Sequence, residues 1–279
     1  MNNTFAFNRF KNLLVNDGKK YFRNFGTALI VSCCLNAIFW IINLLFGSSS
    51  ESVFRFGMLC IWTALAMMLV PEKVYGKANL SREGVGFAML PASSLEKFVS
   101  MFLYCAIVTP IIVFFGGYLV DTLLSLFPFG GFEKPIHLYT MNELVHAFND
   151  TEGAVQAGGE LDLSIEDVFP IGVMRTSLYV GIIQWAAIFM LGNMIFKKRK
   201  AGRTFACYLG IGYVLSTIFG AVMFTNGRME QWMETFEGYP AEEMVRLWHN
   251  ATIWGMIGGI LITAVLLFFT YRKIKTQKY

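Results

Sequence analysis

The segment Val70–Phe98, VPEKVYGKANLSREGVGFAMLPASSLEKF, decides how the rest of the sequence is interpreted, because long hydrophobic runs enter and leave it. Phe54–Val70 precedes it and Phe98–Leu126 follows it. A helix crosses a hydrocarbon core of about 30 Å with roughly 20 mostly apolar residues, and both runs approach or exceed that length. We therefore expect a polar loop whose two ends are fixed in a membrane.

Ser93 and Glu96 mark the end of this loop. A serine that accepts from the third helical N–H, followed by a glutamate that reaches back to the serine N–H, forms a capping box. Pro91 lies just upstream. The spacing predicts that the helix entering the membrane through Phe98 begins at this box. The rest of the loop has a short apolar face that does not by itself distinguish a helix from an ordinary solvated turn.

The composition indicates that the whole chain is a membrane protein. Of its 279 residues 55% are hydrophobic, and they come in long blocks, whereas a soluble domain would spread them periodically over amphipathic elements. We therefore expect an all-α integral membrane protein with six transmembrane helices, the second extending past Pro71 toward Tyr75. The six hydrophobic blocks are Phe25–Phe46, Phe54–Val70, Phe98–Leu126, Thr176–Phe196, Phe205–Phe224 and Ala251–Tyr271.

The distribution of lysine and arginine predicts the orientation of these helices. Cytoplasmic loops of membrane proteins are enriched in basic residues, and the asymmetry here places both termini in the cytoplasm. We expect a multi-pass protein of the cytoplasmic (inner) membrane. The net charge of +4 reflects basic loops retained in the cytoplasm, where they lie beside anionic lipid headgroups. No nucleic acid partner is therefore expected. The basic residues left for the outer segments are Arg55, Lys134, Arg175, Arg228 and Arg246.

The polar segments between the spans suggest further organisation. Phe10, Leu13 and Leu14 lie at helical spacing among basic and polar residues, so an amphipathic basic elbow helix that lies in the interface is expected before the first span, and Gly18 is a candidate for its end. The elbow is predicted at 1–24, and spans one to three at 25–127, with the cytoplasmic loop at 71–97. An acidic extracytoplasmic insert follows at 128–175. Spans four to six are predicted at 176–271, with a basic cytoplasmic loop at 197–204 and an outer helical hairpin at 226–250, before a basic cytoplasmic tail at 272–279.

Motifs for catalysis or metal binding are not found in the sequence. A phosphate-binding P-loop would need Ser or Thr after its Gly-Lys pair, and here Gly76 and Lys77 are followed by Ala78. The three histidines lack the paired spacing of a zinc site, and the five cysteines all lie inside hydrophobic blocks. We therefore expect no enzyme activity, no metal and no cofactor in this chain, and any ATPase must be a partner.

Few polar residues lie within the spans, and none of those inside them is ionisable, which argues against a carrier driven by an ion gradient. We interpret these side chains as hydrogen-bonding groups between helices. Asp121 lies roughly 35 Å along the third span and is predicted to be a carboxylate at the outer interface, while Pro110 predicts a kink. The candidates for lining a transport path are Asn36, Gln184 and Asn193.

The ground plan resembles the membrane subunit of ABC-2-type transporters, and the run Leu90–Phe98 is similar to the segment that leads into the third span of bacterial permease-like proteins of that group. The long acidic insert departs from the plan. The resemblance implies a coupling helix in the 71–97 loop that docks on a separate P-loop ATPase, and pairing with a second permease subunit as a homo- or heterodimer. The implied docking residues, within Asn79–Leu90, are Asn79, Leu80, Arg82, Glu83, Val85, Phe87 and Leu90.

The expected function is therefore that of a membrane-spanning permease subunit coupled to an ATPase. The alternative is a non-transporting membrane sensor, or an assembly or scaffold protein, that presents its acidic outer segment to a partner. Only the first hypothesis requires an ATPase partner, so the identity of a bound partner distinguishes the two.

Overall fold

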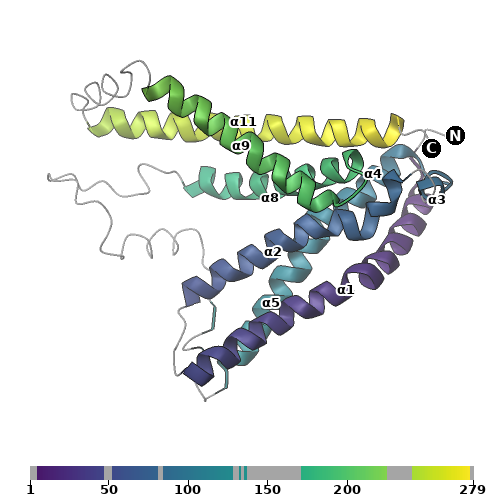
Figure 1. Cartoon of the computed structure of the whole chain (residues 1–279), viewed down its shortest axis with the longest axis horizontal. Coiled ribbons are helices and arrows are strands. Elements are labelled where there is room, and N and C mark those ends of the chain that lie inside the picture. Colours follow the sequence, from purple (N-terminus) through teal and green to yellow (C-terminus); the bar gives the residue numbers. More distant parts are fainter. Residues whose placement is uncertain are drawn as a thin grey trace. The chain divides into compact units, whose positions relative to one another are not determined.

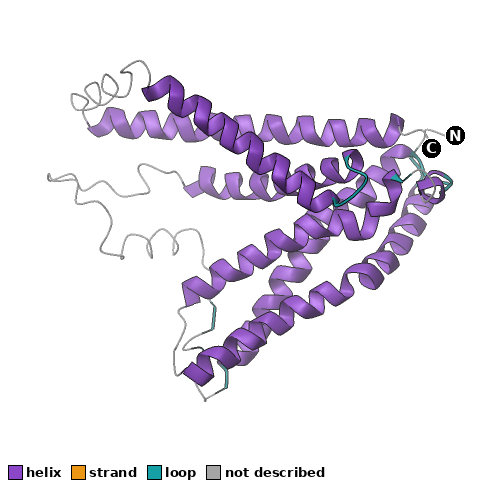
Figure 2. Cartoon of the chain, viewed as in Figure 1, coloured by secondary structure: helices purple, strands orange, loops and turns teal. Residues whose placement is uncertain are grey.

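The computed structural model describes residues 5–46, 52–80, 84–127, 132, 135–136, 171–224 and 241–276. Within these ranges the chain forms helices and short loops and has no strand (Figure 2). This confirms the predicted all-α class. It also confirms the prediction of six helices that are long and apolar enough to cross a membrane. The six helices are Phe7–Phe46, Phe54–Asn79, Ser94–Ser125, Thr176–Ile195, Lys200–Val222 and His249–Thr276.

Helix α1 (Phe7–Phe46) runs through the predicted elbow and the first span without a break. The end predicted at Gly18 is therefore absent. Gly18 instead allows a close approach, because a Cβ at this position would lie 2.6 Å from the hydroxyl oxygen of Tyr104. Gly18 matters here because it has no side chain, and its conformational freedom is not used.

Helix α2 (Ser52–Tyr75) continues through Pro71, as predicted. A 3₁₀ turn, η1 (Gly76–Asn79), and a short helix, α3 (Gly84–Ala88), follow it before α4 (Ser94–Phe102) begins. The loop between the second and third spans is thus partly helical.

The capping box at the start of α4 is confirmed. The Glu96 N–H donates to Ser93 Oγ at 3.2 Å, and the Ser93 N–H donates to Glu96 Oε2 at 2.8 Å. Two N–H groups that have no intrahelical partner are satisfied in this way.

The third span changes helical type along its length. After α4 comes a π-helical stretch, η2 (Leu103–Val108), and then α5 (Thr109–Ser125). The hydroxyl of Thr109 donates to the Tyr104 carbonyl at 2.7 Å, and Pro110, which has no N–H, follows immediately. A proline inside a helix leaves a carbonyl without its usual donor, and the wider turn before it accommodates this loss.

The remaining helices are α8 (Ile171–Ile195), α9 (Lys200–Phe224) and α11 (Ala241–Thr276). Helix α11 begins directly after Pro240 and joins the predicted second arm of the outer hairpin to the sixth span as one helix. The first arm of that hairpin, and nearly all of the acidic insert, lie outside the described residues.

The chain divides into two compact units. The first contains Met1–Leu138, Ile182–Thr204 and Ala264–Tyr279, and the second contains Tyr139–Gly181 and Phe205–Thr263. In the first unit α1, α2 and α5 pack against one another in pairs (Figure 1). The largest cluster of buried side chains in this unit includes Tyr21, Phe25, Val70, Met101, Met190 and Met194.

Candidate functional site

The first end of the loop between α2 and α4 is held by the segment that connects α8 to α9. Asn79 Nδ2 donates to the Phe196 carbonyl at 3.3 Å. The Glu72 carboxylate, one turn before the end of α2, accepts from the Ala201 N–H at 2.7 Å. An acid at the start of a helix is favourable because the first N–H groups lack intrahelical acceptors. Contacts distant in sequence therefore fix the position of η1.

Lys200 strengthens this attachment. Its buried ammonium donates to the carbonyl of Gly76 and, at 3.1 Å, to that of Asn193. Asn193 in turn donates through Nδ2 to the Tyr75 carbonyl at 3.3 Å. These bonds satisfy carbonyls at the end of α2 and near the end of α8, where the last carbonyls of a helix have no intrahelical donor.

The other end of the loop is joined to the N-terminal segment through Glu96. This carboxylate is fully buried. Besides the Ser93 N–H, it accepts from the Ala6 N–H at 2.8 Å and pairs with Arg9 at 3.3 Å. A buried carboxylate needs such partners, because an uncompensated buried charge is costly. Two polar contacts to this one carboxylate therefore join the start of α4 to the start of the described chain.

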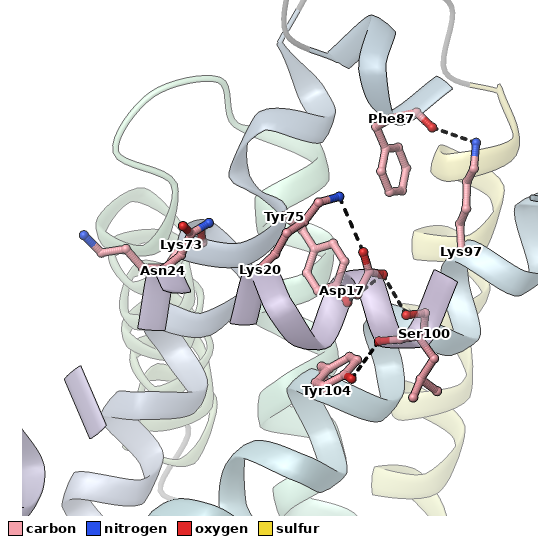
Figure 3. Close-up of polar contacts among 10 residues, drawn as sticks. Asp17, Lys20, Asn24, Lys73, Tyr75, Phe87, Lys97, Ser100 and Tyr104 are labelled. Atoms are coloured by element: carbon pink, nitrogen blue, oxygen red, sulfur yellow. Dashed lines mark hydrogen bonds and ion pairs between the residues drawn. The ribbon is translucent and has the colours of Figure 1, made fainter. Parts of the chain in front are cut away.

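Lys97 connects the short helix α3 to α4. The ammonium of this buried lysine donates to the Phe87 carbonyl at 2.7 Å and lies 5.1 Å from the centre of the Phe87 ring (Figure 3). The ring also packs against the largest buried cluster. One side chain thus holds the end of α3 through both its backbone and its aromatic ring.

Asp17 lies where α1, α2 and α4 meet. Its side chain is only 2% exposed. One oxygen, Oδ2, accepts from the Ser100 hydroxyl at 2.7 Å and from the Tyr75 hydroxyl at 3.3 Å (Figure 3). The other, Oδ1, pairs with Lys20 at 3.6 Å. We did not predict this cluster, because only the Asp17–Lys20 spacing is visible in the sequence.

Tyr104 adds a contact between α1 and η2. Its hydroxyl donates to the Leu14 carbonyl at 2.8 Å (Figure 3). Its ring stacks on that of Tyr21 with centroids 5.5 Å apart. This hydroxyl is the group that Gly18 leaves room for. The polar contacts of Asp17 and Tyr104 together form an inner junction that joins α1 to α2, α4 and η2.

The predicted docking residues are distributed along this loop. Asn79 is engaged by the Phe196 carbonyl, and Arg82 and Glu83 lie outside the described residues. Met89 is 79% exposed, and the sequence pattern did not single it out. Half-buried positions are held by Leu80, Val85, Phe87 and Leu90.

The predicted path-lining residues occupy different places. Asn193 is 1% exposed and takes part in the attachment around Lys200. Gln184 is half-buried on α8. Asn36, on α1, lines a cavity of about 200 Å³ at the ends of α1, α2 and α5 that lie away from the inner junction.

Arg55 and Asp121 form a buried ion pair on the wall of this cavity. Arg55 Nε lies 3.3 Å from Asp121 Oδ1, and both residues are 3% exposed. The guanidinium carbon lies 4.0 Å from the centre of the Phe132 ring. Asp121 Oδ2 accepts from the Ile136 N–H at 3.1 Å. Asp121 was predicted as an interfacial carboxylate, and its arginine partner was not foreseen because no local pattern connects the two residues.

No family model, curated protein or solved structure matches the chain. Among the described residues, no group of three or more His, Cys, Asp or Glu side chains is placed to hold a metal ion. Among the described residues, the attachments of the 71–97 loop and the cavity beside Arg55 are the features that bear on function.

Proposed function

We propose that this chain is the membrane-spanning permease subunit of an ABC-2-type, ATP-driven transporter, and that it couples to a separate P-loop ATPase through the loop between α2 and α4. The observation that carries the proposal is the attachment of this loop at both ends. Asn79 and Glu72 hold it to the α8–α9 connection, and Glu96 and Lys97 hold it to α4.

A docking element transmits force only if it is fixed to the parts that must move. Hydrogen bonds to charged groups contribute about 1.5–3 kcal/mol each, and breaking one while its partner stays buried costs the desolvation of that partner as well. The bonds of Lys97 and Lys200 are of this kind. A displacement of α3 would therefore be transmitted to α4 and to the α8–α9 connection before the loop detaches.

Helix α3 and the turn after it offer a surface for the ATPase. Gly86 and Met89 are exposed, while Phe87 between them faces the helices. With both termini in the cytoplasm, as the basic residues predict, this surface lies in the cytoplasm of a multi-pass inner-membrane protein. A second permease subunit would complete the transport path.

The decisive experiment is affinity purification in mild detergent, followed by identification of the proteins that co-elute. We expect a P-loop ATPase, and we expect it to be lost when Asn79–Leu90 is replaced by a Gly/Ser linker. Failure to recover an ATPase with a folded chain would contradict the proposal and favour the sensor or scaffold function.

A single substitution tests the docking surface without removing the loop's internal contacts. Met89→Asp places a charge on an exposed apolar side chain, and we expect it to lower ATPase recovery about tenfold or more, the effect of losing one well-packed interface contact. The matched control is Asn12→Asp, which adds the same charge at an exposed position of α1. Equal recovery with the two variants would remove Met89 and its neighbours from the docking surface.

A further inference from the structure

The cavity beside the Arg55–Asp121 pair has a wall of mixed chemistry. Its lining includes the two buried charges and also Asn36. Three aromatic side chains also line the cavity, those of Phe39, Trp62 and Phe132, and the Phe132 ring lies against the Arg55 guanidinium. A ligand in this cavity would require neither the permease assignment nor an ATPase partner.

The buried charges indicate a ligand more than a packing role. Removing two charges from water is expensive, and well-packed apolar side chains of similar volume often stabilise a protein as well or better. Ionisable residues within membrane helices commonly mark sites for substrates or ions. Here Arg55 and Asp121 lie beside open space and not in a filled core.

The two charges lie side by side, which constrains the ligand's own charge. A guanidinium offers five N–H donors and a carboxylate about four acceptor sites, so each can engage a further group beyond its present partners. A singly charged ligand would leave an unbalanced charge next to Arg55 or Asp121. A zwitterion would balance both, with its anionic group at Arg55 and its ammonium at Asp121.

The α1 side of the cavity has an apolar, exposed wall. Ile38 and Ile42 line it and are 49% and 43% exposed, in contrast to the buried charges. Ile42 lies four residues before the end of α1 and Asp121 four residues before the end of α5, so both are about 6 Å from the helix ends, and Ile38 lies about 6 Å deeper at 1.5 Å per residue. The exposed wall therefore starts level with the charged pair and runs toward the middle of the spans.

We propose that this cavity binds the headgroup of a zwitterionic phospholipid of the ethanolamine class, with an acyl chain along the exposed wall at Ile38 and Ile42. The volume of about 200 Å³ equals roughly seven water volumes of about 30 Å³ each, which suits a headgroup and not a whole lipid. The chain then lies against α1, where acyl chains surround a transmembrane helix.

The test uses the full chain in nanodiscs of phosphatidylglycerol. A trace of phosphatidylethanolamine carrying a diazirine in one acyl chain is photolysed, and labelled peptides are identified by mass spectrometry. We expect labelling of α1 at 35–42 and of α2 at 58–62 to exceed that by a phosphatidylglycerol probe with the same chain about tenfold, the effect of one charged hydrogen bond.

Two kinds of variant test the assignment. The double variant Arg55→Gln/Asp121→Asn removes both charges without leaving one unpaired, and we expect it to reduce ethanolamine labelling to the glycerol level. Ile38→Trp fills the apolar side without touching the charges, and we expect the same loss. Its matched control is Ile41→Trp, an exposed α1 position outside the cavity lining, which should label like the unmodified chain.

Equal labelling by the two lipid probes would overturn the proposal. So would unchanged labelling in Ile38→Trp, and this comparison with Ile41→Trp decides the question even if the double variant does not fold. Loss of the lipid label on addition of free leucine would assign the cavity to a soluble zwitterion and would equally reject the lipid.

Discussion

Asp17 shows how much one carboxylate contributes at the inner junction. Three groups from three positions meet it: Ser100 and Tyr75 through hydroxyls and Lys20 through its ammonium. The Lys20 side chain is about one-third exposed, so its pairing adds little, since exposed ion pairs are worth about 0–1 kcal/mol. The hydroxyl bonds are buried and dominate the contribution of Asp17 to stability.

Replacing Asp17 tests this ranking. Asp17→Ala leaves the Ser100 and Tyr75 hydroxyls without their acceptor, at about 1–3 kcal/mol for each unsatisfied group. Asp17→Asn keeps a carbonyl oxygen in the same place and loses mainly the weak pairing with Lys20. We expect thermal unfolding in detergent to show a large decrease in Tm for the alanine variant and a small one for the asparagine variant. Equal decreases would show that charge, and not hydroxyl pairing, is what the site requires.

At the level of elements, adjacent glycines on α5 have different surroundings. A Cβ at Gly117 would overlap the Leu59 side chain of α2 and lie 3.3 Å from Asn36 Nδ2 of α1, whereas a Cβ at Gly116 would meet no atom within 4 Å. The packing of α5 against α1 and α2 therefore depends on Gly117 and not on its neighbour.

The two alanine substitutions are a matched pair. We expect Gly117→Ala to destabilise by about 1–3 kcal/mol, the usual cost of overpacking. Gly116→Ala should be neutral or stabilising, because alanine is favoured over glycine in a helix by up to about 1 kcal/mol. The comparison is made by thermal unfolding of both variants in the same detergent. A similar loss of stability in both variants would show that both glycines provide helix flexibility, and that close packing at Gly117 is not the cause.

Local elements of this chain were predictable and long-range contacts were not. The start of α4 follows from Ser93 and Glu96, three residues apart, because a cap depends on neighbours along the chain. The pairing of Asp17 with Ser100, or of Arg55 with Asp121, depends on how helices pack, and no spacing within one helix encodes it. The π-helical turn is an intermediate case, since Pro110 predicted a disturbance but not its form.

For the molecule as a whole, hydropathy alone predicted six helices long enough to span a membrane, because a spanning segment must satisfy its backbone hydrogen bonds internally. The orientation rests on a separate signal, the excess of basic residues in the segments assigned to the cytoplasm. The two signals are independent, so the orientation needs its own test.

Reporter fusions measure the orientation directly. With both termini in the cytoplasm, a green fluorescent protein fused after Tyr279 should be fluorescent, and an alkaline phosphatase at the same site should be inactive. The reverse pattern is expected for both reporters at position 150, within the acidic segment predicted outside. Fluorescence at both positions would contradict the six-span arrangement, since an odd number of crossings separates them.

The two carbonyls that share the Lys200 ammonium belong to different connections, one after α2 and one near the end of α8. The 71–97 loop consequently depends on contacts from outside its own sequence. A chimera that transplants this loop into another membrane scaffold would lack Lys200, which donates to the Gly76 carbonyl, and the Phe196 carbonyl, which accepts from Asn79. A functional graft has to include 193–201 as well, so the two connections form a single unit of exchange in protein engineering.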